Sequence, residues 1–512
     1  MSIHPGSQRA EAAAPAGVRM PAAGLLANLQ EMERTREAYW RRYPATSPTR
    51  LRWRAQAVRH AMHVTAGDTV LEIGAGGGLW TRELALALPD SVVTAAVFNE
   101  ELAAQAEQSG ASNVVLVGPG ELPAGDFDYV VGTAILSHDR YQEHLDWVRT
   151  LLRPGGQLLF FEANYWNPQV FAKAQSVRLA RWSRNADCQI ALRKAAVGRA
   201  LERQGFRDSI VVPYDILHAR TPSGLVPTVQ SAAFVAEHLP GVRELCGQLF
   251  ISARLPGHAP RRRRPDLTRH AQFRGAVSVV VPCHNEAMNI AGLVDALRES
   301  YDAYLKEIVL VDDNSSDDTA ARGEALAAAD PRVRVVRREP PAGVGRALRD
   351  GYAATTGEYI LTMDCDFEML VPELRDLFDA VAEGCDGAIG SRFSYDSVLL
   401  NYPAGKLLGN RAFHALVRLL SRRRVRDVSN NLKLYRGDIL RELEIGQDGF
   451  AANAETGLAP ILAGANIREV PIAWINREAE MGVSSFKVLR VAPGYAIGLA
   501  RMLLRTRARS RT

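Results

Sequence analysis

Cysteine is scarce in this sequence, with five residues among 512. The thiols form no Cys-x-x-Cys pair and have none of the Cys/His spacings that are typical of zinc sites. Neither a disulfide framework nor a structural zinc site therefore explains the fold well, and a reducing, cytoplasmic compartment is expected. The five residues are Cys188, Cys246, Cys283, Cys365 and Cys385.

Long apolar runs are also missing. The best candidate for a membrane span, Val491–Ala500, has about half of the roughly 20 residues that a spanning helix needs. We therefore expect no transmembrane helix. Residues 1–24 have no apolar core behind a basic start, so a disordered leader is expected there rather than a signal peptide.

Charge of one sign is only slightly in excess, with a net charge of +5 and a pI near 8.9. Nucleic-acid binding usually needs a concentrated basic patch, so no nucleic-acid partner is expected. The hydrophobic fraction of 47% and the charged fraction of 23% are ordinary for a globular protein. A chain of 512 residues predicts two or three domains.

Strands and helices alternate along the first half of the chain. The apolar strand Thr69–Leu71 runs into a glycine-rich turn, and a helix from Leu79 to Leu88 follows before Pro89. This order allows the backbone to approach a nucleotide-like ligand closely. Further strands are expected at Ser91–Val97, Val114–Val117, Asp128–Val131, Gln157–Glu162, Phe206–Tyr214 and Gln248–Arg254, which predicts one doubly wound α/β domain.

The segments VLEIGAGGG, FDYVVGTAILSH and LLRPGGQLLFFE resemble class I S-adenosylmethionine-dependent methyltransferases over residues 25–256. The resemblance implies a Rossmann-like methyltransferase fold and S-adenosyl-L-methionine as cofactor. The family's acidic residue at the end of the second strand is replaced here by Val97, and Asn99 is the candidate substitute for the ribose contact. A non-catalytic binding module is the alternative. The implied cofactor-binding residues are Glu72, Gly74, Gly76, Gly78 and Asn99.

Residues 257–274 separate the two halves and are rich in proline and arginine, including the run Arg261–Arg264. This composition makes a poor core and predicts an exposed basic linker. Contact of the arginines with anionic lipid or phosphate is the less favoured alternative.

In the second half, four successive strands end in polar or charged residues. The apolar run Tyr359–Met363 ends in Asp364 and Asp366, two carboxylates that are placed to hold a hard divalent cation and, through it, a diphosphate. Because open α/β sheets bind ligands at the carboxyl ends of their strands, one site is expected at this edge. The other strand ends carry Pro282–Glu286, Asp312–Asp313 and Gly343–Arg346.

The segments VPCHNE, VDDNSSDDT, AGVGRALRDGY, MDCDFE, IGSRF and NREAEMGVSSFK resemble family 2 of the glycosyltransferases over residues 275–487. The likeness is to the polyprenol-phosphate mannosyltransferase branch and implies the GT-A fold of nucleotide-diphospho-sugar transferases, with Mg²⁺ or Mn²⁺ on Asp364 and Asp366. The implied donor-binding residues are Pro282, Glu286, Asp313, Gly345 and Arg346, and the implied catalytic residues are Asp364, Asp366, Glu368, Arg392, Asp427, Glu455 and Arg477.

The resemblance implies an inverting transfer from a GDP- or UDP-linked sugar to a polyprenyl phosphate. A hydroxyl acceptor is the alternative and would need a carboxylate base, for which Glu368, Asp427 and Glu455 are candidates. A third interpretation makes methylation the main activity. The basic, amphipathic residues 488–512 and the segment Leu407–Arg424 suit a membrane surface, which predicts peripheral attachment to the inner face of the plasma membrane.

Overall fold

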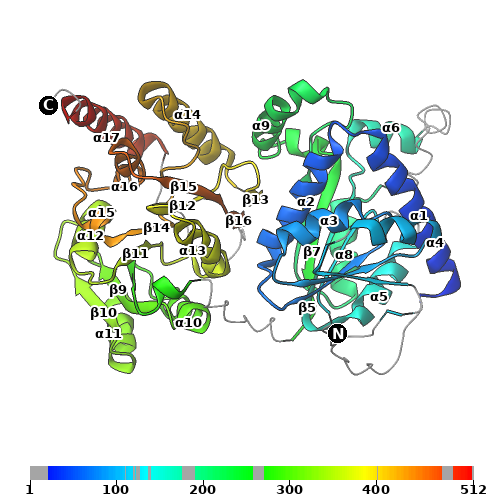
Figure 1. The fold of residues 1–512 in the computed structure, drawn as a ribbon, viewed down its shortest axis with the longest axis horizontal. Helices are drawn as coiled ribbons and strands as arrows, with labels where there is room; N and C mark the ends of the chain where they lie inside the picture. The colour runs from blue at the N-terminus through cyan, green and yellow to red at the C-terminus, as the bar shows by residue number, and fades with distance from the viewer. Residues whose placement is uncertain are drawn as a thin grey trace, which may run out of the picture.

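The computed structural model describes most of the chain as a mixed α/β protein with two large sheets (Figure 1). Residues 1–20 of the expected leader, most of the linker with Arg261–Arg264, and Arg477 lie outside the described residues. The leader was predicted to extend to residue 24, but Ala23 and Gly24 already belong to the first helix, Ala23–Arg42. The structure describes residues 21–109, 111–118, 121–122, 127–136, 140–175, 191–257, 270–400, 402–475 and 488–509.

The first sheet has seven strands in the order β3-β2-β1-β4-β5-β7-β6. The first five are parallel neighbours, and β7 runs antiparallel between β5 and β6. This is the doubly wound arrangement that the alternation predicts. The strands are β1 Thr69–Ile73, β2 Val92–Ala96, β3 Val114–Val117, β4 Phe127–Thr133, β5 Leu152–Ala163, β6 Arg207–Tyr214 and β7 Gln248–Arg254.

Helices cover this sheet on both faces (Figure 1). The central strands are almost wholly buried, as expected for parallel strands covered on both faces. The helices are α1 Ala23–Arg42, α2 Ser47–Met62, α3 Leu79–Ala87, α4 Glu100–Ala106, α5 Tyr141–Leu151, α6 Pro168–Gln175, α8 Lys194–Arg203 and α9 Val226–Ala236.

The second sheet also has seven strands, in the order β10-β9-β8-β11-β14-β12-β15. Strand β14 runs antiparallel between β11 and β12, and the other neighbours are parallel. The strands are β8 Val277–Cys283, β9 Leu305–Asp312, β10 Val333–Arg337, β11 Tyr359–Thr362, β12 Gly387–Ser391, β14 Lys433–Arg436 and β15 Ile467–Pro471, and a separate pair joins β13 Val398–Leu400 to β16 Ala473–Ile475.

Two hydrophobic clusters lie on opposite faces of this sheet, because alternate residues of β8 enter each of them. Among the described residues, no helix combines the length and hydropathy needed to cross a membrane. The helices of this half are α10 Ile290–Tyr301, α11 Thr319–Ala329, α12 Val344–Ala353, α13 Leu374–Ala382, α14 Ala404–Ser421, α15 Gly437–Arg441, α16 Ala452–Leu462 and α17 Val488–Arg509.

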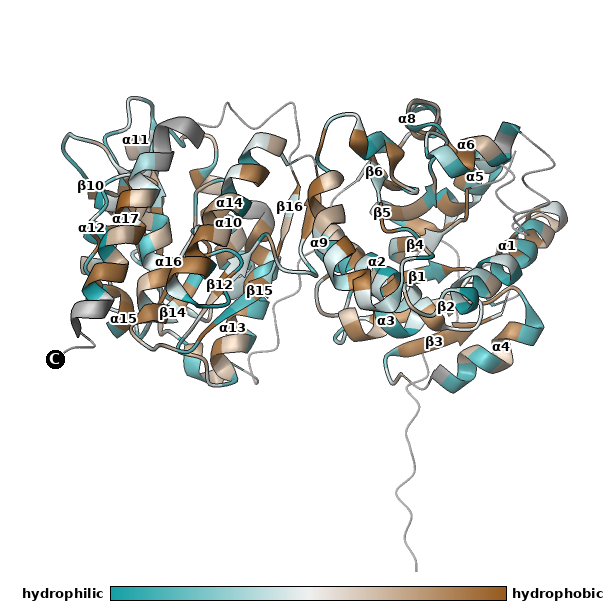
Figure 2. Ribbon diagram, turned by 90° about the horizontal axis from the view of Figure 1, so that it is seen from above, coloured by the Kyte–Doolittle hydropathy of each residue, from teal (hydrophilic) through white to brown (hydrophobic). Residues whose placement is uncertain are grey.

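The two halves meet through α2 and α9 on one side and the β13/β16 pair on the other (Figure 2). Val398 and Ile475 join the same hydrophobic cluster as α2, and Trp53 Nε1 donates to Tyr395 O at 2.7 Å. The junction is therefore packed rather than a loose tether.

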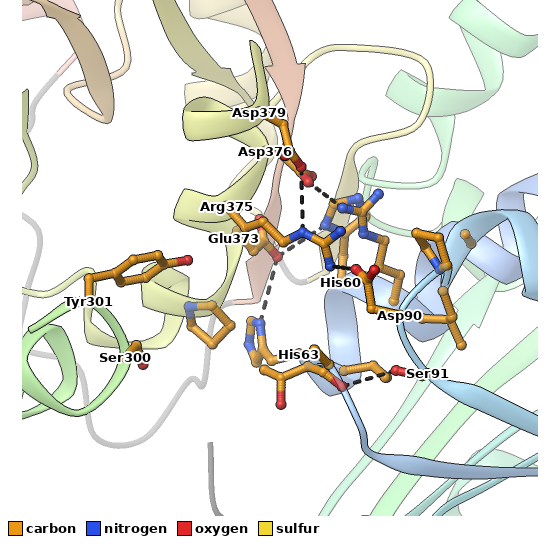
Figure 3. A pocket seen from close by; sticks show the side chains of 18 of the residues that line it. His60, His63, Asp90, Ser91, Ser300, Tyr301, Glu373, Arg375, Asp376 and Asp379 are labelled. Atoms are coloured by element: carbon orange, nitrogen blue, oxygen red, sulfur yellow. Dashed lines mark hydrogen bonds and ion pairs between the residues drawn. The ribbon is translucent and has the colours of Figure 1, made fainter. Parts of the chain in front are cut away.

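A cavity of about 350 Å³ lies beside this junction (Figure 3). His60 and His63 at the end of α2 point toward Glu373, with His60 Nδ1 at 3.1 Å and His63 Nδ1 at 3.6 Å from Glu373 Oε1. Arg59 pairs with Asp376, and Arg375 pairs with Asp90. Ion pairs thus add to the apolar contact between the halves.

Candidate functional site

The carboxyl ends of β8 and β11 bring three acidic residues of the second half together. The two strands are parallel neighbours, with Thr362 opposite Val280. The chain leaves β11 into Asp364 and Asp366, and it leaves β8 toward Glu286. Parallel neighbours end at the same sheet edge, so these side chains share one region of the molecule.

The three carboxylates lie within electrostatic reach of one another. Burial, followed by the charges of Asp364 and Glu286, raises the pKa of Asp366 to about 7. Burial also raises the pKa values of Asp364 and Glu286, and for Glu286 the Asp364 carboxylate adds to the increase. A cluster whose members resist ionisation together attracts a cation.

Asn431 holds Asp364 in place. Its Nδ2 donates to Asp364 Oδ1 at 2.6 Å, and Asn431 itself is buried. The hydrogen bond fixes one carboxylate oxygen of Asp364.

Lys406, in the first turn of α14, is a cation that the sequence analysis missed. Burial and then Arg392 lower its pKa, while Asp366 and Asp364 act in the opposite direction, so the ammonium lies within electrostatic reach of both aspartates. No local sequence pattern signals this role, because the contact depends on how α14 packs against the strand ends.

Arg392 and Asp427 form a buried, two-pronged ion pair. Arg392 Nε donates to Asp427 Oδ2 at 2.7 Å, and Nη2 donates to Oδ1 at 2.9 Å. The backbone amide of Arg392 also donates to Asp427 Oδ2 at 3.0 Å. Burial opposes ionisation of Asp427, but Arg392 outweighs it and keeps the pKa of this carboxyl below its usual value. Asp427 is thus fully engaged in holding Arg392.

The expected donor-binding residues lie along the loops after β8 and β9. Asp313 Oδ2 accepts from the Gly343 amide at 2.6 Å, and its other oxygen pairs with Arg338. Pro282 is half-buried in β8. The structure therefore places Asp313 and Pro282 at adjacent strand ends, with Asp313 already bound by protein donors.

Gly345 and Arg346, at the start of α12, contact the loop at residues 447–448. Arg346 Nη2 lies 2.7 Å from Asp448 Oδ2, and the Gly345 amide donates to Asp448 O at 2.8 Å. A Cβ on Gly345 would lie 2.0 Å from Gln447 O. In this structure the glycine is required by the loop that packs against it.

Glu455 lies on α16 and is occupied by the same loop. Its Oε2 accepts from the amides of Gly446 and Gln447 at 2.8 and 2.9 Å. Burial raises its pKa, and Arg505 and Arg501 of α17 oppose that rise. Glu368 begins a 3-10 helix, Glu368–Glu373, but its side chain lies outside the described residues, as does Arg477.

A second candidate site lies in the first half, at the turn between β1 and α3. Gly74, Gly76 and Gly78 have φ values of 70°, 59° and 81°, which favour glycine. Burial raises the pKa of Glu72, at the end of β1, to about 7. Asn99 is buried, and its Oδ1 accepts from the Glu101 amide at 3.0 Å as the cap of α4.

Each half of the chain matches a known protein family. The family described as Glycosyl transferase family 2 matches residues 278–444, and a family described as Methyltransferase domain matches residues 36–209. Polyprenol monophosphomannose synthase of Mycolicibacterium smegmatis is 31% identical over 218 residues, which are 40% of this chain and 79% of that enzyme.

Two further similarities concern the same half. Dolichol-phosphate mannosyltransferase of Pyrococcus furiosus is 29% identical over 178 residues, 34% of this chain and half of that enzyme's length. A crystal structure of glucosyl-3-phosphoglycerate synthase from Mycobacterium tuberculosis with Mn²⁺, UDP-glucose and phosphoglyceric acid has a TM-score of 0.38 and 19% identity, covering 48% of this chain and 86% of that one.

Proposed function

Because this chain belongs to family 2 of the glycosyl transferases and also carries a methyltransferase domain, we propose that it transfers a hexosyl unit from a GDP- or UDP-linked sugar to a polyprenyl phosphate, with inversion. The observation that carries the proposal is the grouping of Glu286, Asp364 and Asp366 at neighbouring strand ends. We assign the transfer to residues 275–487 and the methyltransferase fold to residues 25–256.

The chemistry of the cluster suits a hard divalent cation. Asp364 and Asp366 offer carboxylate oxygens, which Mg²⁺ and Mn²⁺ prefer. Burial raises the pKa values of both, and at Asp366 the charges of Asp364 and Glu286 add to the increase, so a bound cation would offset the cost of ionising them. Among the described residues no three His, Cys, Asp or Glu side chains could hold a metal on their own, so donor phosphate and water would complete the ligand set. Such an ion neutralises charge on a diphosphate leaving group.

An anionic acceptor fits the arrangement better than a hydroxyl. A hydroxyl nucleophile needs a base, whereas a lipid phosphate is already ionised. Asp427 holds Arg392 through both of its carboxylate oxygens and is not free to take a proton, whereas Glu455 accepts two backbone amides through Oε2 alone. The alternative with a hydroxyl acceptor therefore loses Asp427 as a candidate base and keeps Glu455.

Arg392 and Lys406 provide positive charge for the acceptor phosphate. Asp427 fixes the guanidinium of Arg392 through Nε and Nη2 and leaves Nη1 directed toward Tyr402 OH at 3.5 Å. Lys406, on α14, lies within electrostatic reach of Asp364 and Asp366. A cation whose geometry is fixed in advance binds a phosphate without losing further side-chain freedom.

Helices α14 and α17 supply a surface for a lipid-borne acceptor. They pack together through Val417, Leu499 and Met502. Leu419 of α14 is 75% exposed and Leu504 of α17 is 66% exposed. Exposed leucines beside arginines suit an anionic membrane surface, which supports attachment at the cytoplasmic face. The neighbouring arginines are Arg422, Arg423, Arg424, Arg501 and Arg505.

The experiment is a transfer assay with the purified full chain, Mn²⁺ and radiolabelled GDP- and UDP-hexoses. One arm contains undecaprenyl phosphate, and a matched arm contains undecaprenol, which has the same chain and a hydroxyl. We expect labelled lipid only in the phosphate arm. Equal labelling of undecaprenol would refute the acceptor class, and labelling of neither lipid with any donor would refute the proposal.

A further inference from the structure

Helix α1 lies directly over the glycine-rich turn of the N-terminal half and points two carboxylates into it. Glu33 is 1% exposed although it belongs to the first long helix of the described chain. Glu37, one helical turn later, is also buried. A buried carboxylate is costly unless donors surround it, so its donors identify what α1 does here.

Glu33 takes up the backbone donors at the ends of β1 and β2. Its Oε1 accepts from the Gly76 amide at 3.2 Å and from the Phe98 amide at 3.1 Å. Its Oε2 accepts from the Phe98 and Asn99 amides at 3.0 and 2.8 Å. These donors come from the turn and strand end where a nucleotide-like ligand of this fold would bind.

The neighbouring side chains of α1 complete the contact. Glu37 Oε2 accepts from the Gly77 amide at 3.2 Å, and Arg36 Nη1 donates to Thr133 O, at the end of β4, at 2.7 Å. A Cβ on Gly77 would lie 2.6 Å from Glu37 Oε1, so the helix touches the turn closely. Gln30 Nε2 adds a hydrogen bond to Phe98 O at 3.0 Å.

We propose that α1 is the built-in occupant of this cradle, with Glu33 and Glu37 in place of a cofactor. The residues present do not fit S-adenosyl-L-methionine while α1 is docked, because the amides of Gly76, Gly77, Phe98 and Asn99 already have acceptors from the same chain. The N-terminal half is thus closed to this cofactor in the conformation described, and binding requires α1 to leave the turn.

The positions at which the sequence departs from the resembled methyltransferase family agree with this assignment. Val97 stands where the resembled family carries an acidic residue, and Asn99 uses its Oδ1 to cap α4. The carboxylate missing from the end of β2 is supplied by Glu33, but its hydrogen bonds are made to the protein. The cradle is therefore complete without a ligand.

The test is isothermal titration of the full chain with S-adenosyl-L-methionine at concentrations up to about 1 mM. The variants are Glu33→Ala, Glu37→Ala, both together, and the control Glu31→Ala, whose carboxylate on the same helix is 64% exposed. We expect no binding by the wild type or the control, and a gain of at least about tenfold in the double variant. Absence of binding in a folded double variant would overturn the proposal.

Hydrogen exchange of residues 23–42 keeps the proposal testable if a variant fails to fold. In the wild type, S-adenosyl-L-methionine at about 1 mM is expected to leave exchange along α1 unchanged, because the docked helix excludes the ligand. Binding with α1 still protected would overturn the proposal. Glycosyl transfer, measured in parallel, is expected to be unchanged in Glu31→Ala and reports the integrity of the other half.

Discussion

At the scale of single residues, the pKa of Asp366 carries the most information about the site. Burial and the neighbouring carboxylates raise it to about 7 from an ordinary value of 3.8. Between these two values the folded state holds a proton that the unfolded state has released. The metal-free protein therefore loses stability as pH rises from about 4 to 7.

Replacing Asp366 by Asn removes this penalty. We expect Asp366→Asn to stabilise the chelator-treated protein at pH 8 by about 2–4 kcal/mol, and to have little effect at pH 4. Urea unfolding at the two pH values measures this difference. Asp438→Asn is the control, because Asp438 is about half exposed and its pKa is lowered rather than raised. An equal effect of Asp366→Asn at both pH values would contradict the repulsion.

At the scale of elements, the sequence predicted those parts that have an apolar pattern. The expected strand Thr69–Leu71 and helix Leu79–Leu88 correspond to β1 and α3, which end at Ile73 and Ala87. Strand β14 escaped prediction because Lys433–Arg436 reads KLYR, with a charge at both ends. Lys433 is nonetheless fully buried. This burial is tolerated because its Nζ donates to Asn453 O and Thr456 Oγ1 at 2.6 Å each.

The site was predictable only in part, because the sequence pattern reveals only those residues that follow apolar strands. Asp364, Asp366 and Glu286 follow apolar strands, so sheet topology alone brings them together. Lys406 and Asn431 reach the cluster through tertiary packing, which local pattern does not reveal. The contact of Glu33 with the turn after β1 likewise depends on how α1 docks.

The exposed leucines of α14 and α17 lead to an element-scale prediction. We expect Leu419→Ser combined with Leu504→Ser to weaken binding to anionic vesicles by about tenfold or more, because each leucine contributes about 1.5–3 kcal/mol when buried. Vesicle flotation measures the loss. Leu86→Ser on α3, where Leu86 is 67% exposed, is the control and should bind as the wild type does. Unchanged flotation of the double variant would exclude this surface.

At the scale of the whole molecule, Glu373 connects the two halves. Its Oε1 faces His60 and His63, and its Oε2 accepts from the Ala473 amide at 2.9 Å. Burial opposes ionisation, but the two histidines lower the pKa of Glu373 to about 2 from an ordinary 4.5. The stability that this cluster contributes is present above pH 4.5 and is lost as pH falls toward about 2.

Removal of His60 should leave the Glu373 carboxylate buried with a weaker partner. We expect His60→Ala to destabilise the junction by about 3 kcal/mol, because breaking a buried pair leaves an uncompensated charge. Calorimetry should show the two halves unfolding in separate transitions. His218→Ala, at an exposed histidine of the same half, is the control. A single transition with an unchanged midpoint in His60→Ala would show that the ion pairs do not couple the halves.

The most direct test of the transferase site is a titration of the full chain with Mn²⁺ in the presence of GDP or UDP. Electron paramagnetic resonance measures the fraction of Mn²⁺ that is bound. We expect one bound ion in the wild type, an Mn²⁺ affinity reduced by at least about tenfold in both Asp364→Asn and Asp366→Asn, and an unchanged affinity in Asp438→Asn. Equal Mn²⁺ affinity in all four proteins would contradict the assignment of the strand-end aspartates to a metal-bound sugar nucleotide.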